Sequence, residues 1–345
     1  MRPSLQASLV NGRFGDPSLF VEAPLRGRAL LLDLGELHRL PVAALLRVDA
    51  ALVTHAHVDH LIGFDTLLRH LVGREKRLPI LGPPGIAERI GHKLLGYAWD
   101  LAGLYEAALQ FDVTELSADG SRRHTRFRLA SGFRAEPVAE EAAPADGVVL
   151  RLPGLSVQAA TLEHHGLACL GYRLEEDPTV NVTQAGIERM GLRPGPWING
   201  LKRALLDGVP DDCPLPLGRG ESRTIGDLRA VATISQGFRL TYCTDLADTP
   251  ENRAAVEALA QDADLLFLEA AFAAADAGIA ARRGHLTTRA TGEIARTAGA
   301  RRLEPFHFSA RYRGEEARML AEVAAAFTGG AENPRGWLAS TAPGR

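Results

Sequence analysis

Cysteine is scarce in this chain of 345 residues, which holds only Cys169, Cys213 and Cys243. Their odd number and wide spacing exclude a disulfide framework and a CxxC-type metal site, so we expect a reducing compartment, the cytoplasm. Long apolar runs are also missing. No stretch approaches about 18 uninterrupted apolar residues, and residues 1–10 contain no continuous apolar segment, so neither export nor membrane spanning is expected.

An excess of one charge is missing as well. The chain has 39 Lys and Arg against 42 Asp and Glu, a net charge of −3. A polyanionic substrate would therefore be held by local basic patches rather than by the field of the whole molecule. Hydrophobic residues make up 46% and charged residues 23%, which excludes disordered and fibrous classes.

Short apolar runs alternate with helical patterns, which predicts a layered α/β protein. The strands are expected at residues 29–33, 50–54, 78–81, 156–161, 238–244 and 265–268. One amphipathic helix is expected at residues 61–71, and the alanine-rich stretches 270–281 and 321–326 predict further helix. Several of the strands end at a polar residue, as in α/β enzymes that build their sites at strand ends.

The strand pattern weakens between Tyr172 and Ile234, where Gly, Pro and mixed charge dominate. This composition favours an inserted arm outside the main sheets. We place the arm at residues 174–225, within a single domain of residues 1–345.

Four metal-capable side chains lie within six residues: His55, His57, Asp59 and His60. They follow an expected strand and precede the expected helix. Residues two apart in an extended segment point the same way, so His55 and His57 can hold one cation from one side. Asp59 and His60 then turn toward a neighbouring position, which predicts two ions close together.

Later strand ends offer the remaining ligands, namely His165, Asp245 and His307. An aspartate suits a bridge between two cations because each carboxylate oxygen can serve one of them. His164 competes with His165 for the third position. Asp33, at the end of the first strand, is either a partner that orients the histidine loop or a turn cap.

The histidine motif resembles that of the metallo-β-lactamase superfamily, and further motifs are similar to those of its ribonuclease Z branch, which trims the 3′ ends of precursor tRNA. In chain order these are His165 before Gly171-Tyr172-Arg173, Gly195-Pro196 with Leu201-Lys202, Thr244-Asp245, Leu268-Glu269-Ala-Ala-Phe272, Gly284-His285-Leu-Thr-Thr288 and His307-Phe-Ser-Ala-Arg311-Tyr312. The resemblance spans residues 29–312. It implies an αββα sandwich of two mixed β-sheets flanked by helices, with the inserted arm.

The resemblance also implies two zinc ions per chain. Their ligands would be His55, His57, His165 and Asp245 for one ion, and Asp59, His60, Asp245 and His307 for the other. His165 is preferred to His164 because its seven-residue offset to Tyr172 matches the family. Manganese or iron could occupy similar ligands.

The family motifs imply the catalytic and substrate-binding roles too. Asp59 would accept or orient a proton of the attacking water, while Glu269 would orient His285 as proton donor. Phosphate and RNA contacts are expected from two groups: Ser309, Arg311 and Tyr312 beyond a ligand, and Gly195, Pro196, Lys202 and Arg203 in the arm. The expected substrate is precursor tRNA, and the resemblance alone suggests a homodimer.

Two other functions fit parts of the sequence. The segment Gly63-Phe64-Asp65 departs from the Gly-Leu-Pro of the family, which favours a phosphodiesterase or esterase for a small molecule or cyclic nucleotide. A non-catalytic binding module is the second alternative. Every expected ligand has a candidate, however, which argues against that module.

Overall fold

The structure is a computed structural model that describes residues 5–24, 27–104, 108–218 and 220–329. Residues 1–4 and 330–345 of the predicted domain and Arg219 of the predicted arm lie outside the described residues. The chain separates into two units. One contains residues 1–151, 157–174 and 239–345, and the other contains residues 152–156 and 175–238.

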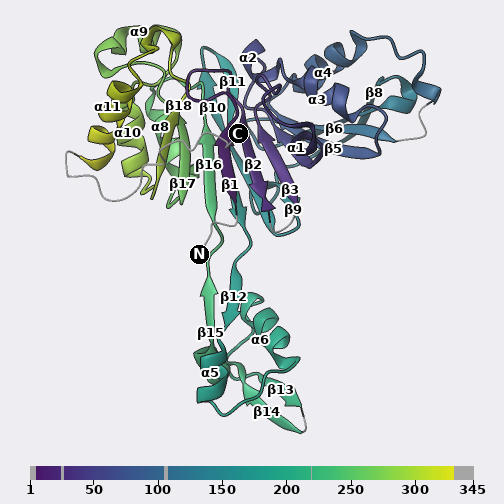
Figure 1. Ribbon diagram of the computed structural model, residues 1–345, viewed down its shortest axis with the longest axis vertical. Helices are drawn as coiled ribbons and strands as arrows, with labels where there is room; N and C mark the ends of the chain where they lie inside the picture. Colours follow the sequence, from purple (N-terminus) through teal and green to yellow (C-terminus); the bar gives the residue numbers. More distant parts are fainter. Residues whose placement is uncertain (1–4, 25–26, 105–107, 219, 330–345) are drawn as a thin grey trace. The chain divides into compact units, whose positions relative to one another are not determined.

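An eight-stranded sheet forms the first layer of the larger unit (Figure 1). Its strands, in spatial order, are β1 (Gln6–Leu9), β2 (Leu19–Ala23), β3 (Arg28–Leu32), β4 (Val48–Leu52), β5 (Lys76–Gly82), β6 (Leu109–Leu116), β7 (Arg122–Arg128) and β8 (Ala135–Glu141). The four strands β3–β6 are parallel, whereas the outer pairs are antiparallel. The sheet is therefore mixed, and its central parallel strands are apolar because both of their faces are covered.

A six-stranded sheet forms the second layer. Its order is β18 (Leu303–Phe306), β17 (Leu265–Glu269), β16 (Arg239–Cys243), β11 (Leu167–Glu176), β10 (Leu155–His164) and β9 (Val148–Leu152). The strands β16, β17 and β18 are parallel. Only residues 165–166 join the neighbours β10 and β11, so this pair is an antiparallel hairpin and the sheet is also mixed.

Helices cover the outer face of each sheet (Figure 1). The first sheet packs with α1 (Val42–Leu46), α2 (Val58–Leu61), α3 (Phe64–Leu71) and α4 (Ile86–Leu95) in one core. The second packs with α8 (Pro250–Leu259), α9 (Ala277–Arg283), α10 (Thr288–Thr297) and α11 (Glu316–Thr328) in another. The short 3₁₀ helices are η2 (Ala102–Leu104), η3 (Leu129–Ser131), η5 (Ala274–Asp276) and η6 (Ala310–Tyr312).

The two sheets contact each other directly. The hydroxyl of Tyr172 on β11 donates to the carbonyl of Val53, 2.8 Å away, and the amide of Leu170 donates to the carbonyl of Thr54 at 2.9 Å. This arrangement of two mixed sheets flanked by helices confirms the predicted αββα sandwich.

Two predicted helices differ in the structure. The helix expected at residues 61–71 is divided at Gly63, which lies so close to the carbonyl of Gly35 that a Cβ atom there would have no space. The helix expected at residues 270–281 begins only at Ala277. Residues 270 and 271 instead continue β17 beside the end of β18, since Ala270 N donates to Phe306 O and Ser309 N donates to Ala271 O. The helix expected at residues 321–326 is confirmed within α11.

The second unit has its own sheets and core. Strand β12 (Thr179–Val182) pairs antiparallel with β15 (Ala232–Ser235), and β13 (Pro214–Gly218) pairs with β14 (Glu221–Thr224). Its helices are α5 (Gln184–Arg189), α6 (Trp197–Leu206), α7 (Ile225–Leu228) and η4 (Arg229–Val231). Buried residues of α6 and α7, including Trp197, Leu201 and Leu228, form its core.

In the part of the chain that the structure describes, no helix has both the length and the apolar character needed to cross a membrane.

Candidate metal centre

The carboxyl ends of strands from both sheets meet at one cluster of His and Asp side chains. Asp33 follows β3, Asp245 follows β16, and His307 follows β18 directly. All three residues adopt left-handed backbone angles, with φ of 59°, 54° and 58°. Such angles are uncommon outside glycine, and each one turns the chain sharply where the strand ends. At these three positions the uncommon backbone angle belongs to a residue whose carboxylate or imidazole group lies in or beside the cluster.

The first part of the cluster contains His55, His57 and His164, with one ligand atom of each within 4.8 Å of the others. His55 Nε2 lies 2.9 Å from His57 Nδ1. The two residues belong to the extended segment between β4 and α2, as their spacing predicts. Three imidazole nitrogens that converge in this way suit one tetrahedral divalent ion with a fourth ligand.

The second part contains Asp59, His60 and His307, whose ligand atoms also lie within 4.8 Å of one another. Asp59 is in the first turn of α2 and His60 in its last turn. Their carboxylate and imidazole groups are 3.7 Å apart at the closest atoms. The structure thus separates the four residues of the histidine motif into two adjacent groups.

Asp245 lies between the two groups. Its Oδ2 is 3.1 Å from His60 Nε2, and its Oδ1 is 3.3 Å from His307 Nε2 and 3.8 Å from His164 Nε2. Although burial opposes ionisation, His307 and His60 hold the pKa of Asp245 well below its ordinary value. Oδ1 therefore lies near a member of each group, His164 and His307, while Oδ2 lies near His60. An ionised carboxylate in this position is suited to bridge two ions.

The donor atoms fit two divalent ions. His60 Nε2 is fully buried and has no hydrogen-bond partner among the described residues, despite its nearness to Asp245. A buried polar atom without a partner is costly, and a metal ion at this nitrogen would satisfy it. Burial, and next the neighbouring His60, lower the pKa of His55 to about 2. His55 is therefore neutral, which is the form that ligates metal.

Asp33 orients His60 by binding the ring nitrogen that faces away from the cluster. His60 Nδ1 donates to Asp33 Oδ2 at 2.9 Å, which leaves Nε2 free to face the cluster. Asp33 in turn accepts hydrogen bonds from the amide of Thr54 at 2.7 Å and from the hydroxyl of Tyr242 at 2.9 Å. Of the two readings of Asp33, the structure favours the partner of the histidine loop. Thr54 and Tyr242 were missed in the sequence because each lies within an apolar strand pattern.

The structure brings His164, and not the preferred His165, to the cluster. Strand β10 ends at His164, whose side chain is buried like that of Leu162 two positions earlier, as strand alternation requires. His164 Nδ1 donates to the carbonyl of Gly284 at 2.9 Å, so Nε2 faces the cluster. His165 begins the hairpin turn with φ of 50°, its side chain is exposed, and it belongs to none of the His and Asp groups found among the described residues.

His285 and Glu269 lie together beside Asp245. His285 Nδ1 donates to Glu269 Oε2 at 3.0 Å and is 3.8 Å from Asp245 Oδ1. Glu269 is fully buried at the end of β17 and also accepts the amide of Leu246 at 2.8 Å. Burial lowers the pKa of His285, but the charge of Glu269 and its hydrogen bond outweigh this and raise the pKa to about 9.

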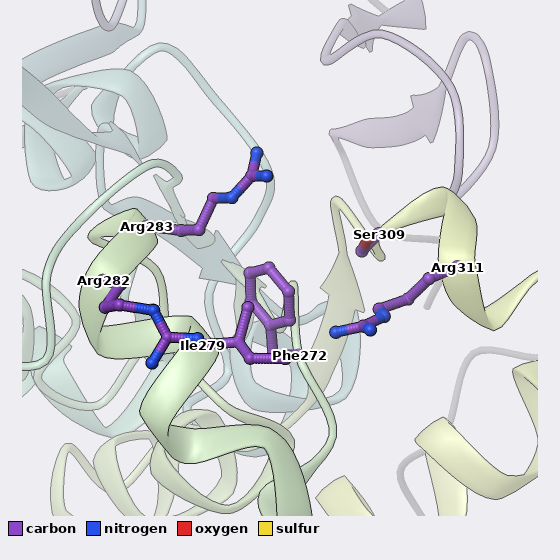
Figure 2. A pocket seen from close by; sticks show the side chains of 6 residues that line it. All are labelled: Phe272, Ile279, Arg282, Arg283, Ser309 and Arg311. Atoms are coloured by element: carbon purple, nitrogen blue, oxygen red, sulfur yellow. The ribbon is translucent and has the colours of Figure 1, made fainter.

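The residues expected to contact substrate occupy different places. Ser309 lines the cavity at the metal centre, which has a volume of about 230 Å³ and is also lined by Asp59, His285 and His307. Arg311 lines the adjoining cavity (Figure 2). Tyr312 is buried, and its hydroxyl donates to Asp276 rather than facing either cavity.

The four expected arm residues belong to the second unit. Pro196 precedes α6 as its N-cap, with Gly195 before it, while Lys202 and Arg203 lie on α6 itself. Trp197, the first residue of that helix, anchors the segment because its indole nitrogen donates to the carbonyl of Arg193 at 2.9 Å.

Comparison with known proteins finds the same architecture and related sequences. The family model of the β-lactamase superfamily domain matches residues 27–186 and 214–308. A ribonuclease Z of Deinococcus radiodurans is 35% identical over 344 residues, which cover 98% of this chain and all of that protein. Two crystal structures share the fold at 16% identity. They are the metallo-β-lactamase fold protein YhfI from Bacillus subtilis, with a TM-score of 0.54 over 94% of this chain and 93% of that one, and the short form of human tRNase Z, with a TM-score of 0.52 over 89% and 93%.

Proposed function

Because this chain belongs to the β-lactamase superfamily and is a metal-dependent hydrolase of the ribonuclease Z-like kind, we propose that it removes 3′ trailers from precursor tRNA with two zinc ions per chain. The observation that carries the proposal is Asp245, a buried carboxylate placed between two groups of imidazole and carboxylate ligands. The relatedness to ribonuclease Z along nearly the whole chain supports the choice of RNA as substrate.

The ligands would be His55, His57 and His164 for one ion and Asp59, His60 and His307 for the other, with Asp245 shared. Two such ions would activate a water molecule near neutral pH and would draw charge from the phosphate under attack. Asp33 holds the ring of His60 in position from behind, and Asp59 is the carboxylate of the centre that can accept a proton from the attacking water.

Two side chains would accept and supply the protons that the reaction requires, Asp59 and His285. The oxygen of water forms a bond to phosphorus while the bond from phosphorus to the 3′ oxygen of the tRNA breaks. One proton of the water passes to Asp59, and the departing 3′ oxygen takes a proton from His285. Glu269 keeps the imidazole of His285 protonated and correctly turned. The products are tRNA with a 3′ hydroxyl and a trailer with a 5′ phosphate.

The segment Gly63-Phe64-Asp65 gives little support to a small-molecule substrate. Phe64 is fully buried in the first core, and Asp65 Oδ2 lies 2.8 Å from Lys93 Nζ. Neither residue is among those that line the cavity at the metal centre. The departure from the family pattern therefore changes the packing of α3 and leaves the walls of the site as they are.

The test is a gel assay of the zinc-loaded protein on precursor tRNA with a 3′ trailer, beside the same RNA without a folded acceptor stem. We expect discrete cleavage of the folded RNA at the trailer junction. Hydrolysis of bis(p-nitrophenyl) phosphate with no cleavage of either RNA would reject tRNA as substrate and favour a small phosphodiester. Metal content well below one ion per chain would instead favour a binding module.

We also propose a cytoplasmic location and a homodimer. All three cysteines are free thiols, and Cys169 and Cys243 are buried, which fits a reducing compartment. The dimer rests on the family relationship, and light scattering after size exclusion would measure it directly.

A further inference from the structure

An arginine-lined cavity adjoins the metal centre in the larger unit. This arginine pocket has a volume of about 530 Å³ and is lined by Phe272, Ile279, Arg282, Arg283, Ser309 and Arg311 (Figure 2). It shares Phe272, Arg283 and Ser309 with the cavity that contains Asp59, His285 and His307. A molecule bound at the metal centre can therefore extend directly into the arginine pocket.

The pocket carries positive charge that nearby carboxylates leave largely unpaired. Arg282 and Arg283 are exposed and form no ion pair with the residues that the structure describes. Arg311 approaches one carboxylate, Asp276, at 4.0 Å, and that group already accepts the hydroxyl of Tyr312. Three guanidinium groups around one cavity, in a chain of net charge −3, form a local basic patch of the kind that an anionic substrate requires.

The local fold places these arginines on two opposite walls. Figure 2 shows Arg282 and Arg283 on one side, Ser309 and Arg311 on the other, and Phe272 with Ile279 between them. The first pair ends α9, and Gly284, with φ of 62°, turns the chain directly into His285. The second pair follows the proposed ligand His307. Arg283 stands two positions before His285, and Ser309 stands two positions after His307, so both walls are continuous with residues that line the cavity at the metal centre.

The chemistry of the walls fits a nucleic-acid strand. Guanidinium groups bind phosphate oxygens in a bidentate manner and stack on bases. The apolar side chains of Phe272 and Ile279 offer a surface to a ribose or a base between those phosphate contacts. A cyclic mononucleotide or a simple diester has one phosphate, which would bind at the metal centre. It would leave Arg282 and Arg311 unused, because these two residues line only the arginine pocket.

We propose that the arginine pocket binds the phosphate next to the scissile one, so that this enzyme recognises at least two consecutive phosphodiesters of a single-stranded RNA segment. The proposal rests on the function given above, because it takes the metal centre as the place of cleavage. It adds Arg282 and Arg283 to the substrate contacts. Arg282, which lines only the arginine pocket, becomes a residue that determines specificity for a strand over a small diester.

The test compares the variant Arg282→Ala with wild type on two substrates, because Arg282 lines the arginine pocket and not the cavity at the metal centre. For precursor tRNA we expect KM to rise about tenfold. The slope of log affinity against log salt concentration should become shallower by about one. For bis(p-nitrophenyl) phosphate we expect kcat/KM within about twofold of wild type. Arg289→Ala is the matched control, since Arg289 is exposed on the neighbouring α10 and lines neither cavity.

A lysine variant separates the effect on RNA binding from the effect on helix stability. Basic residues in the last turn of a helix stabilise it whatever they bind. Arg282→Lys keeps that charge and loses the bidentate contacts, so we expect an intermediate KM for RNA at an unchanged melting temperature. An RNA with a neutral methylphosphonate in place of the phosphate next to the scissile one should bind wild type more weakly. The same replacement should change binding by the alanine variant much less.

Equal losses on RNA and on the small diester, or wild-type kinetics on RNA, would overturn the proposal. If wild type hydrolyses the diester but does not cleave precursor tRNA, the tRNA function fails and the pocket is still tested. Fluorescence anisotropy with a short single-stranded RNA then decides, because tighter binding by wild type than by the alanine variant supports the pocket and equal binding rejects it.

Discussion

His285 Nδ1 lies 3.0 Å from Glu269 Oε2, and this carboxylate is fully buried and also holds the amide of Leu246. The pair therefore has a fixed geometry, in which one nitrogen of His285 is engaged and the ring is kept in one orientation. Glu269 acts through His285, so it is a positioning residue, whereas His285 is the group expected to give its proton to substrate.

We expect His285→Ala to lower kcat on precursor tRNA by about 10² to 10⁴, the usual contribution of a general acid, while zinc content stays unchanged. Glu269→Gln should lower kcat less and should narrow the pH range of activity on its alkaline side, because the charge that keeps His285 protonated is lost. Zinc analysis by mass spectrometry and pH profiles would measure both. Unchanged rates for His285→Ala would remove it from the mechanism.

The adjacent histidines 164 and 165 provide a matched pair for the metal centre. His164→Ala removes a proposed ligand, so we expect zinc affinity to fall by more than about 100-fold, beyond the 10- to 100-fold typical of a residue that only orients a ligand. His165→Ala removes an exposed imidazole in the hairpin turn and should leave affinity and activity unchanged. Titration of the chelator-treated proteins with zinc would measure the difference, and the reverse result would restore the sequence-based preference for His165.

The sequence predicted most of the layered fold but not this choice between neighbours. Motif offsets pointed to His165, whereas the side chain that enters the cluster is decided by where β10 ends and by strand alternation. A shift of one residue at a strand end reverses the direction of a side chain, and apolar patterns define strand ends only within a few residues.

The same physical reason explains the other differences. The helical pattern at residues 61–71 is real, yet Gly63 divides it because the chain packs against the backbone of Gly35, a contact between segments distant in sequence. Residues 270–273 have alanine-rich helical composition, but residues 270 and 271 continue β17 through hydrogen bonds to Phe306 and Ser309. Tertiary contacts of this kind override local propensity and leave no mark in the sequence.

Glu304 on β18 predicts a pH dependence of stability. It is buried beside Arg13, and burial raises its pKa from about 4.5 to about 7 even though Arg13 lowers it. A carboxyl whose pKa is higher in the folded state contributes stability that is complete below the unfolded pKa, near 4.5, and is lost as the pH rises through 7. Since one pKa unit corresponds to about 1.4 kcal/mol, Glu304→Gln should gain roughly 1–3 kcal/mol over wild type at pH 8 compared with pH 4.5.

Urea unfolding at both pH values would measure this difference for the chelator-treated protein. Glu316→Gln is the control, because Glu316 contacts the same arginine at 2.6 Å but its side chain is 46% exposed. The difference in unfolding free energy between Glu316→Gln and wild type should change little between the two pH values. An equal change in unfolding free energy between the two pH values for wild type and Glu304→Gln would contradict the raised pKa of Glu304.

Two buried tyrosines allow the orienting role of Asp33 to be separated from general stability. Tyr242→Phe removes the hydroxyl that donates to Asp33 Oδ2, the same oxygen that holds His60 Nδ1. Tyr172→Phe removes a hydroxyl that donates to the backbone carbonyl of Val53 at the contact between the sheets. Each change leaves one buried acceptor with fewer donors, so each should cost about 1–3 kcal/mol of unfolding free energy.

Only Tyr242→Phe should also weaken zinc binding, by about 10- to 100-fold, because only Asp33 orients a proposed ligand. Equal zinc affinity in the two variants would mean that Asp33 holds His60 without help from Tyr242.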